Sequence, residues 1–173
     1  MHAMAEPRDV LVDGFGRVRE VVHAALRRQT PDDLAWRPAP GANTIGWLVW
    51  HLTRVQDDHV ADAFDLPQVW TAHGWAERLD LPRPPGDTGY GDTAEQVGAL
   101  RASADALAGY HDAVHARTVE LLAGVDAADL DRIVDTSWDP PVTLGVRLVS
   151  VLSDDLQHAG QAAYVRGLAR ARG

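Results

Sequence analysis

Histidine and aspartate side chains spaced one helical turn apart give this sequence its clearest capacity for chemistry. Near the C-terminus, Asp154 and His158 are four residues apart, so on a helix their side chains lie on one face, one turn from each other. At this spacing a helix can offer two ligands to one metal ion. Asp155, three residues before His158, is the competing carboxylate. The pattern predicts a metal site centred on His158; the alternative is a polar face that contacts only water.

A third candidate ligand lies in the segment WLVWHLTRV, where His51 is surrounded by apolar residues. On a helix, His51 shares a face with Trp47 and Val55, so its imidazole is expected to be buried. A buried imidazole needs a partner for each ring nitrogen, and a metal ion together with a hydrogen-bond acceptor supplies both. The alternative is a hydrogen-bonded core histidine. Asp58 and His59 continue this face, either as groups that contact substrate or as the solvated end of the helix.

Other polar residues have weaker spacing signals. His111 and His115 are four residues apart and could form a second ligand pair, or they could be hydrogen-bonded histidines of the core or its rim. Arg54 and Arg166 could bind a carboxylate of a substrate, or they could be surface arginines. Gln161 shares the polar face near the C-terminus and is a further candidate for contact with substrate or ligands.

Helices must position these side chains, because the apolar residues recur at helical spacing and no segment shows the alternation of strands. The periodicity predicts four helices, at about residues 9–29, 44–64, 92–121 and 143–169. The residues at 65–91 are rich in proline and glycine but contain Trp70, Trp75 and Tyr90, so we expect an ordered loop that borders the site. The predicted fold is an all-α four-helix bundle, with this long loop between the second and third helices, forming one domain over residues 8–170.

Composition excludes several classes of protein. The 173 residues have a net charge of -9, which disfavours nucleic acid as a partner. There is no cysteine, so disulfides and a cysteine nucleophile are excluded. No apolar run approaches the roughly 18 residues of a membrane span, and the N-terminus does not resemble a signal peptide, so we expect a cytoplasmic protein. All 16 basic residues are arginine, a bias typical of GC-rich bacterial genomes.

Three segments together resemble the DinB-like (YfiT-like) metal-binding four-helix bundles over about Val10 to Gly167. They are NTIGWLVWHLTRVQDDH, TGYGDTAEQV and WDPPVTLGVRLVSVLSDDLQHAGQAAYVRG. More narrowly, they are similar to an actinobacterial branch that includes the N-terminal domain of mycothiol-dependent maleylpyruvate isomerase and mycothiol S-transferase-like proteins. The absence of lysine is consistent with an actinobacterial source.

The resemblance implies a divalent metal, zinc or nickel, held by three ligands. His51 matches the histidine of the second helix, and His158 matches the final histidine of the fourth helix. Asp154 falls at the middle ligand, where many relatives have histidine and the isomerase branch has glutamate. The resemblance also implies mycothiol as the cosubstrate, which would supply the thiol that the chain itself lacks.

We therefore expect a metal-binding, thiol-dependent transferase or isomerase that acts on small electrophilic molecules. Two alternatives stay open. One is a non-catalytic module that binds a metal or another ligand, and the other is a metal-dependent hydrolase in which Asp58 or His59 carries a proton. A homodimer is also expected, with the exposed sides of the first and third predicted helices as its candidate surfaces.

Overall fold

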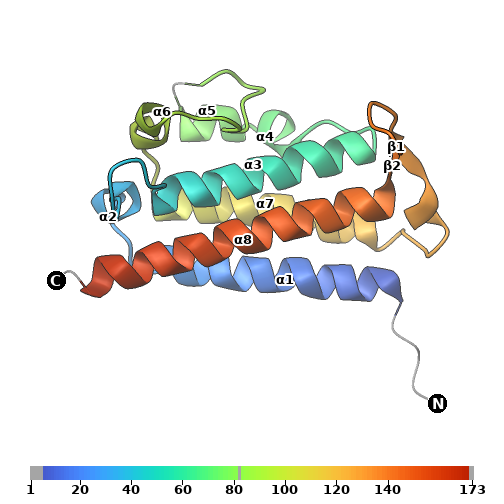
Figure 1. Ribbon diagram of the computed structural model, residues 1–173, viewed down its shortest axis with the longest axis horizontal. Coiled ribbons are helices and arrows are strands. Elements are labelled where there is room, and N and C mark those ends of the chain that lie inside the picture. Colours follow the sequence, from blue (N-terminus) through green and yellow to red (C-terminus); the bar gives the residue numbers. More distant parts are fainter. Residues whose placement is uncertain (1–5, 82, 172–173) are drawn as a thin grey trace, which may run out of the picture.

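Four long helices dominate the computed structural model, which describes residues 6–81 and 83–171, and they lie side by side (Figure 1). They are α1 (Pro7–Leu26), α3 (Ile45–Ala63), α7 (Ala104–Leu122) and α8 (Leu144–Ala171). The predicted all-α class is confirmed to the extent that the chain is mostly helical. Residues 1–5, which are part of the N-terminal segment assessed for a signal peptide, lie outside the described residues. No helix of the described part is long and apolar enough to cross a membrane.

Short elements connect the long helices. They are α2 (Pro31–Ala35), α4 (Val69–Ala72), α5 (Trp75–Leu79), α6 (Ala94–Ala99), the 3-10 helix η1 (Asp129–Asp131), β1 (Ile133–Asp135) and β2 (Val142–Thr143). The two strands pair antiparallel in a small hairpin just before α8. The sequence did not predict this hairpin, because strands of two and three residues are too short to show alternation.

Hydroxyl side chains determine where three of the long helices begin. Thr44, Ser103 and Thr143 each accept a hydrogen bond from the backbone N–H three residues later, at 3.0, 3.1 and 3.3 Å. Such N-caps satisfy a backbone donor that has no partner within the helix. The Ser103 cap also explains one wrong prediction. Residues 92–121 form two helices rather than one, because Leu100 is extended after α6 and a new helix starts beyond Ser103.

Helix α3 is the central element, and both of its sides are covered. It packs against α7 and α8, while α4, α5 and α6 lie above it in Figure 1. Even the polar residues Thr53, Arg54, Gln56 and Asp57 of α3 are buried. Helix α8 buries one stripe against α1 and α3, formed by Leu144, Leu148, Val151, Asp155, Ala159, Ala162 and Val165. Its polar neighbours Asp154 and His158 therefore lie at the edge of the α3–α8 contact.

A buried polar network holds the segment between α3 and α6 against α3. Asp57 accepts hydrogen bonds from the backbone N–H groups of Val69 and Trp70 at 2.8 and 2.7 Å, and from the Tyr110 hydroxyl at 2.8 Å. Arg54 lies 3.6 Å from Asp57 and also donates to Tyr110. The expected loop at 65–91 is thus an ordered segment that contains two short helices, α4 and α5.

Candidate metal centre

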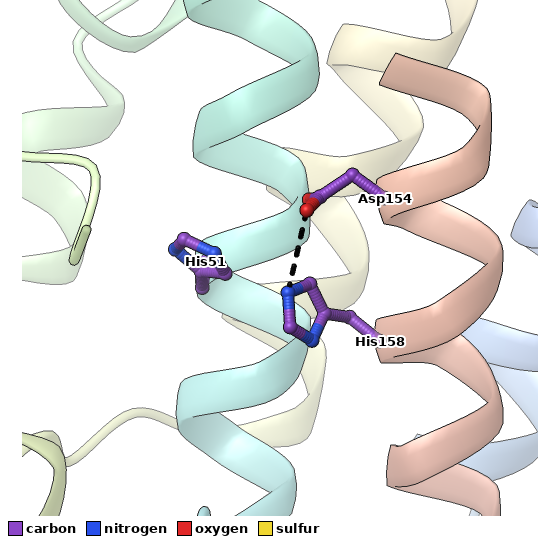
Figure 2. Close-up of side chains that lie close together, drawn as sticks. All are labelled: His51, Asp154 and His158. Carbon is purple, nitrogen blue, oxygen red and sulfur yellow. Dashed lines mark ion pairs between the residues drawn. The ribbon is translucent and has the colours of Figure 1, made fainter. Parts of the chain in front are cut away.

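Three side chains from two helices converge at the edge of the α3–α8 contact (Figure 2). His51 comes from α3, and Asp154 and His158 come from α8. One ligand atom from each residue lies within 4.8 Å of the other two. The Nε2 atom of His158 is 3.5 Å from Oδ1 of Asp154, and the His51 and His158 ring centroids are 4.8 Å apart. The structure therefore brings together the three residues that the resemblance implied as ligands.

The backbone carbonyl of Thr88 determines the tautomer of His51. Nδ1 of His51 lies 2.6 Å from this oxygen, which can only accept, so Nδ1 carries the proton and Nε2 keeps its lone pair. The Trp47 ring stacks on the imidazole with centroids 4.5 Å apart and planes 10° from parallel. Burial lowers the pKa of His51, against the Thr88 hydrogen bond, so the neutral imidazole is favoured. A neutral imidazole with a free Nε2 is the form that binds a metal.

His158 and Asp154 face each other on α8. Nδ1 of His158 is 3.0 Å from Oε1 of Gln161, an acceptor, which leaves Nε2 of His158 directed at Asp154. The hydrogen bond with Asp154 raises the pKa of His158. Burial alone would raise the pKa of Asp154, but the His158 hydrogen bond and the nearby histidine charges lower it below its ordinary value. The carboxylate is therefore ionised at neutral pH.

The donor set fits a divalent transition metal. Two imidazole nitrogens and one carboxylate oxygen suit zinc and nickel. Oδ2 of Asp154 is buried and has no hydrogen-bond partner among the described residues, a costly state that a metal ion would relieve. In a tetrahedral site with ligand atoms about 2.1 Å from the ion, these atoms lie about 3.4 Å apart, so the three side chains, whose ligand atoms lie within 4.8 Å of one another, would close by up to about 1.4 Å.

Comparison with known proteins places the chain in a family. The family description "DinB superfamily" matches residues 15–162, which include all three converging residues. The chain belongs to the DinB superfamily. Among solved structures, this DinB-superfamily chain is similar to one titled "Crystal structure of the conserved protein of locus from Enterococcus faecalis". The two are 28% identical with a TM-score of 0.89, over 97% of this chain and 99% of that one. No curated protein matches the chain.

Asp155, the rival carboxylate, lies in the core of this DinB-superfamily chain. It is fully buried on α8, and neither carboxylate oxygen has a hydrogen-bond partner among the described residues. Burial, with the charge of Asp154 adding to it, raises the pKa of Asp155 well above its ordinary value. Asp154, and not Asp155, therefore belongs to the converging group.

The second histidine pair lies between α1, α3 and α7. His111 is fully buried, and its Nδ1 atom is 3.1 Å from Oγ1 of Thr53, which itself donates to a backbone carbonyl. The His111 and His115 ring centroids are 6.5 Å apart. Within the described residues no third ligand converges with them. His111 is thus a core histidine and His115 lies at the rim. Only Nδ1 of His111 fits the hydrogen-bonded alternative, because Nε2 of His111 and Nδ1 of His115 are buried without a hydrogen-bond partner among the described residues.

The two candidate arginines make their hydrogen bonds to residues outside the converging group. Arg54 is fully buried; its Nη1 atom donates to Oε1 of Gln68 at 2.8 Å, and its guanidinium lies over the Trp70 ring. It is part of the network below α4 rather than a surface arginine. Arg166, towards the C-terminal end of α8, donates to the backbone carbonyl of Arg27 at 3.1 Å.

Asp58 and His59 line a cavity of about 450 Å³ two helical turns along α3 from His51. Nδ1 of His59 lies 3.0 Å from Nη1 of Arg147, which is paired with Asp135 at 2.7 Å. The remaining lining residues are Asp62, Asp65, Leu66 and Gln68. Asp58 and His59 are therefore not ligands of the converging group, although the charge of His59 acts on Asp154. Their cavity is a polar space along the same pair of helices, lined from α3 by Asp58 and His59 and from α8 by Arg147.

Sequence reasoning missed the groups that surround His51. The Thr88 contact is made by a backbone carbonyl, which no side-chain pattern reveals. The one sequence feature at this contact is the glycine that follows Thr88. Gly89 has a backbone φ of +84°, in the region that favours glycine. Trp47 was recognised as a neighbour of His51 on one helix face, but its stacking on the imidazole depends on the packed structure.

Proposed function

We propose that this DinB-superfamily protein binds zinc or nickel through His51, Asp154 and His158, and that it is a mycothiol-dependent transferase or isomerase of small electrophiles. One observation carries the metal assignment. A buried carboxylate oxygen of Asp154 without a hydrogen-bond partner among the described residues lies beside two histidines whose Nδ1 atoms are already engaged, so their Nε2 atoms are available. The wider family resemblance to mycothiol-dependent proteins supports the reaction class.

Three protein ligands leave a coordination position for a further group, which is typical of catalytic sites and not of closed structural ones. A metal in this site would lower the pKa of a thiol bound at that position and so make a thiolate available at neutral pH. The chain has no cysteine, so the sulfur must come from a small thiol. The role of the protein's own residues is to present the neutral imidazole of His51, the ring of His158 and the ionised carboxylate of Asp154 in a fixed arrangement.

The transferase reaction needs no other reactant. The thiol loses its proton to solvent, its sulfur forms a bond to the electrophilic carbon, and the leaving group departs with the bonding electrons. In the isomerase reaction the sulfur would add to an activated double bond and be expelled again after rotation about the carbon–carbon bond. Both reactions use the same thiolate.

Metal analysis tests the first half of the proposal. Purified chain is stripped with chelator, reloaded with zinc or nickel and analysed for metal by mass spectrometry. Stoichiometric metal is expected for the wild type and for a His73→Ala control, because His73 lies exposed between α4 and α5. The His158→Ala variant should lose it. Equal metal contents in the wild type and His158→Ala would refute the site.

Turnover tests the second half. The metal-loaded protein is mixed with 1-chloro-2,4-dinitrobenzene and with mycothiol, glutathione or no thiol, and release of chloride is measured. Chloride release that requires mycothiol and is lost in His158→Ala supports the transferase. Hydrolysis of the probe without any thiol would favour the metal-dependent hydrolase. Metal binding without turnover under any of these conditions would refute the transferase; it would fit the non-catalytic module and would also leave the isomerase, which releases no chloride.

A further inference from the structure

We propose that the loop of residues 83–92 is a positioning element for His51, and that Arg83 is its central positioning residue. The loop fixes which nitrogen of His51 faces the candidate metal site. The part of this inference that concerns metal affinity depends on the proposed function, whereas the part that concerns the His51 tautomer does not.

Arg83 joins the two ends of the loop. Its Nη2 and Nη1 atoms donate to the two carboxylate oxygens of Asp92 at 2.6 and 3.1 Å, and Nη1 also donates to Asp87 at 2.8 Å. The Arg83 and Asp92 side chains are only 8% and 4% exposed. The guanidinium carbon of Arg83 lies 4.6 Å from the centroid of the Trp50 ring on α3. A forked, shielded ion pair of this kind restrains geometry better than an exposed pair.

Two contacts lead from this ion pair to His51. Asp92 accepts a hydrogen bond from Nε1 of Trp47 at 2.7 Å, and Trp47 stacks on the His51 ring. Between the ends of the loop, the Thr88 carbonyl accepts the Nδ1 proton of His51. The stacking of Trp47 therefore fixes the plane of the imidazole, and the Thr88 hydrogen bond fixes its rotation and tautomer.

Gly89 allows the loop to approach His51 this closely. A Cβ atom at this position would lie 2.8 Å from the Trp50 ring and 3.3 Å from Nδ1 of His51, and the φ of +84° also disfavours other residues. The backbone N–H of Gly89 donates to Asp87, the second carboxylate partner of Arg83. The peptide between Thr88 and Gly89, whose carbonyl contacts His51, is thus held by Asp87, and Asp87 is in turn held by Arg83.

Residues that orient a metal-binding histidine affect the site without touching the ion. Losing such a partner typically weakens metal affinity by about 10- to 100-fold. We therefore expect the Arg83→Met variant, which keeps an apolar stem but loses the forked donor, to bind zinc about 10- to 100-fold more weakly than the wild type.

The test combines zinc affinity with a measurement on the metal-free protein. Zinc affinity is measured by competition with a chromophoric chelator for the wild type, Arg83→Met and Gly89→Ala. Arg78→Met is the matched control, because Arg78 also lies over a tryptophan ring, that of Trp75 on α5, and shows no hydrogen bond or ion pair with the loop among the described residues. Thermal unfolding of each variant identifies any that fails to fold; Gly89→Ala keeps every side chain of the ion pair and so provides the second perturbation.

In the metal-free proteins, nitrogen-15 shifts of the His51 ring report its tautomer. The wild type and Arg78→Met should show a proton fixed on Nδ1, whereas Arg83→Met and Gly89→Ala should show a mixture of tautomers. Folded Arg83→Met and Gly89→Ala variants with the wild-type tautomer and wild-type zinc affinity would overturn the inference. If the wild type has the expected tautomer, the two variants lose it and no protein binds zinc, the positioning role stands and the proposed function fails.

Discussion

His111 should make the stability of this protein sensitive to moderate acid. It is fully buried, and burial, with the neighbouring His115 adding to it, lowers its pKa from 6.5 to about 3. Between these two values the unfolded chain binds a proton at this histidine and the folded chain does not. The stabilising contribution of His111 is therefore fully present above the pKa that the histidine has in the unfolded chain. It decreases as the pH falls below about 6.5 and stops decreasing below about pH 3.

The size of the effect follows from the same two pKa values. At pH 5, about 1.5 units below the unfolded pKa and still well above the folded one, the loss relative to pH 8 is about 2 kcal/mol, since one unit is worth about 1.4 kcal/mol. The His111→Asn variant removes the titrating ring and keeps a side-chain donor that could reach the Thr53 hydroxyl oxygen. Its direct cost in packing is present at both pH values and cancels in the comparison.

The assay is urea unfolding of the wild type and His111→Asn at pH 8 and at pH 5. The difference in unfolding free energy between the two proteins should shrink by about 2 kcal/mol at the lower pH. His73→Asn, at an exposed position, is the control and should follow the wild type at both pH values. An unchanged difference between wild type and His111→Asn would refute the reasoning, because it would mean that His111 takes up its proton equally well in the folded protein.

Three further substitutions test the fold and the site. Asp57→Asn should lower the unfolding free energy by about 3 kcal/mol in urea at pH 8, because it leaves the buried guanidinium of Arg54 without its counter-charge; a loss below 1 kcal/mol would contradict this account. Thr44→Val should cost about 1 kcal/mol by removing the cap of α3, and Thr44→Ser should restore most of it, as measured by thermal unfolding. Asp154→Asn keeps the shape of the ligand but removes its charge, so zinc titration should show an affinity at least about tenfold weaker; unchanged affinity would exclude Asp154 as a ligand.

Local sequence determined the helices that carry the three candidate metal ligands. The spacing of four between Asp154 and His158 places both on one turn of any helix that contains them, whatever that helix packs against. The apolar residues around His51 likewise predicted a buried helix, and α3 begins directly after its N-cap, Thr44. Periodicity and capping act over a few residues, so they can be read without knowledge of the fold.

Only the tertiary structure decided which of these side chains meet. His51 lies more than a hundred residues from Asp154 and His158, and the three converge because α3 and α8 pack together. The rotation of α8 in that contact places Asp155 in the core and Asp154 at the site, a choice that spacing left open. Packing also buried Arg54 and brought the Thr88 carbonyl against His51. These outcomes depend on long-range contacts and backbone atoms, which residue types and their spacing along the chain do not encode locally.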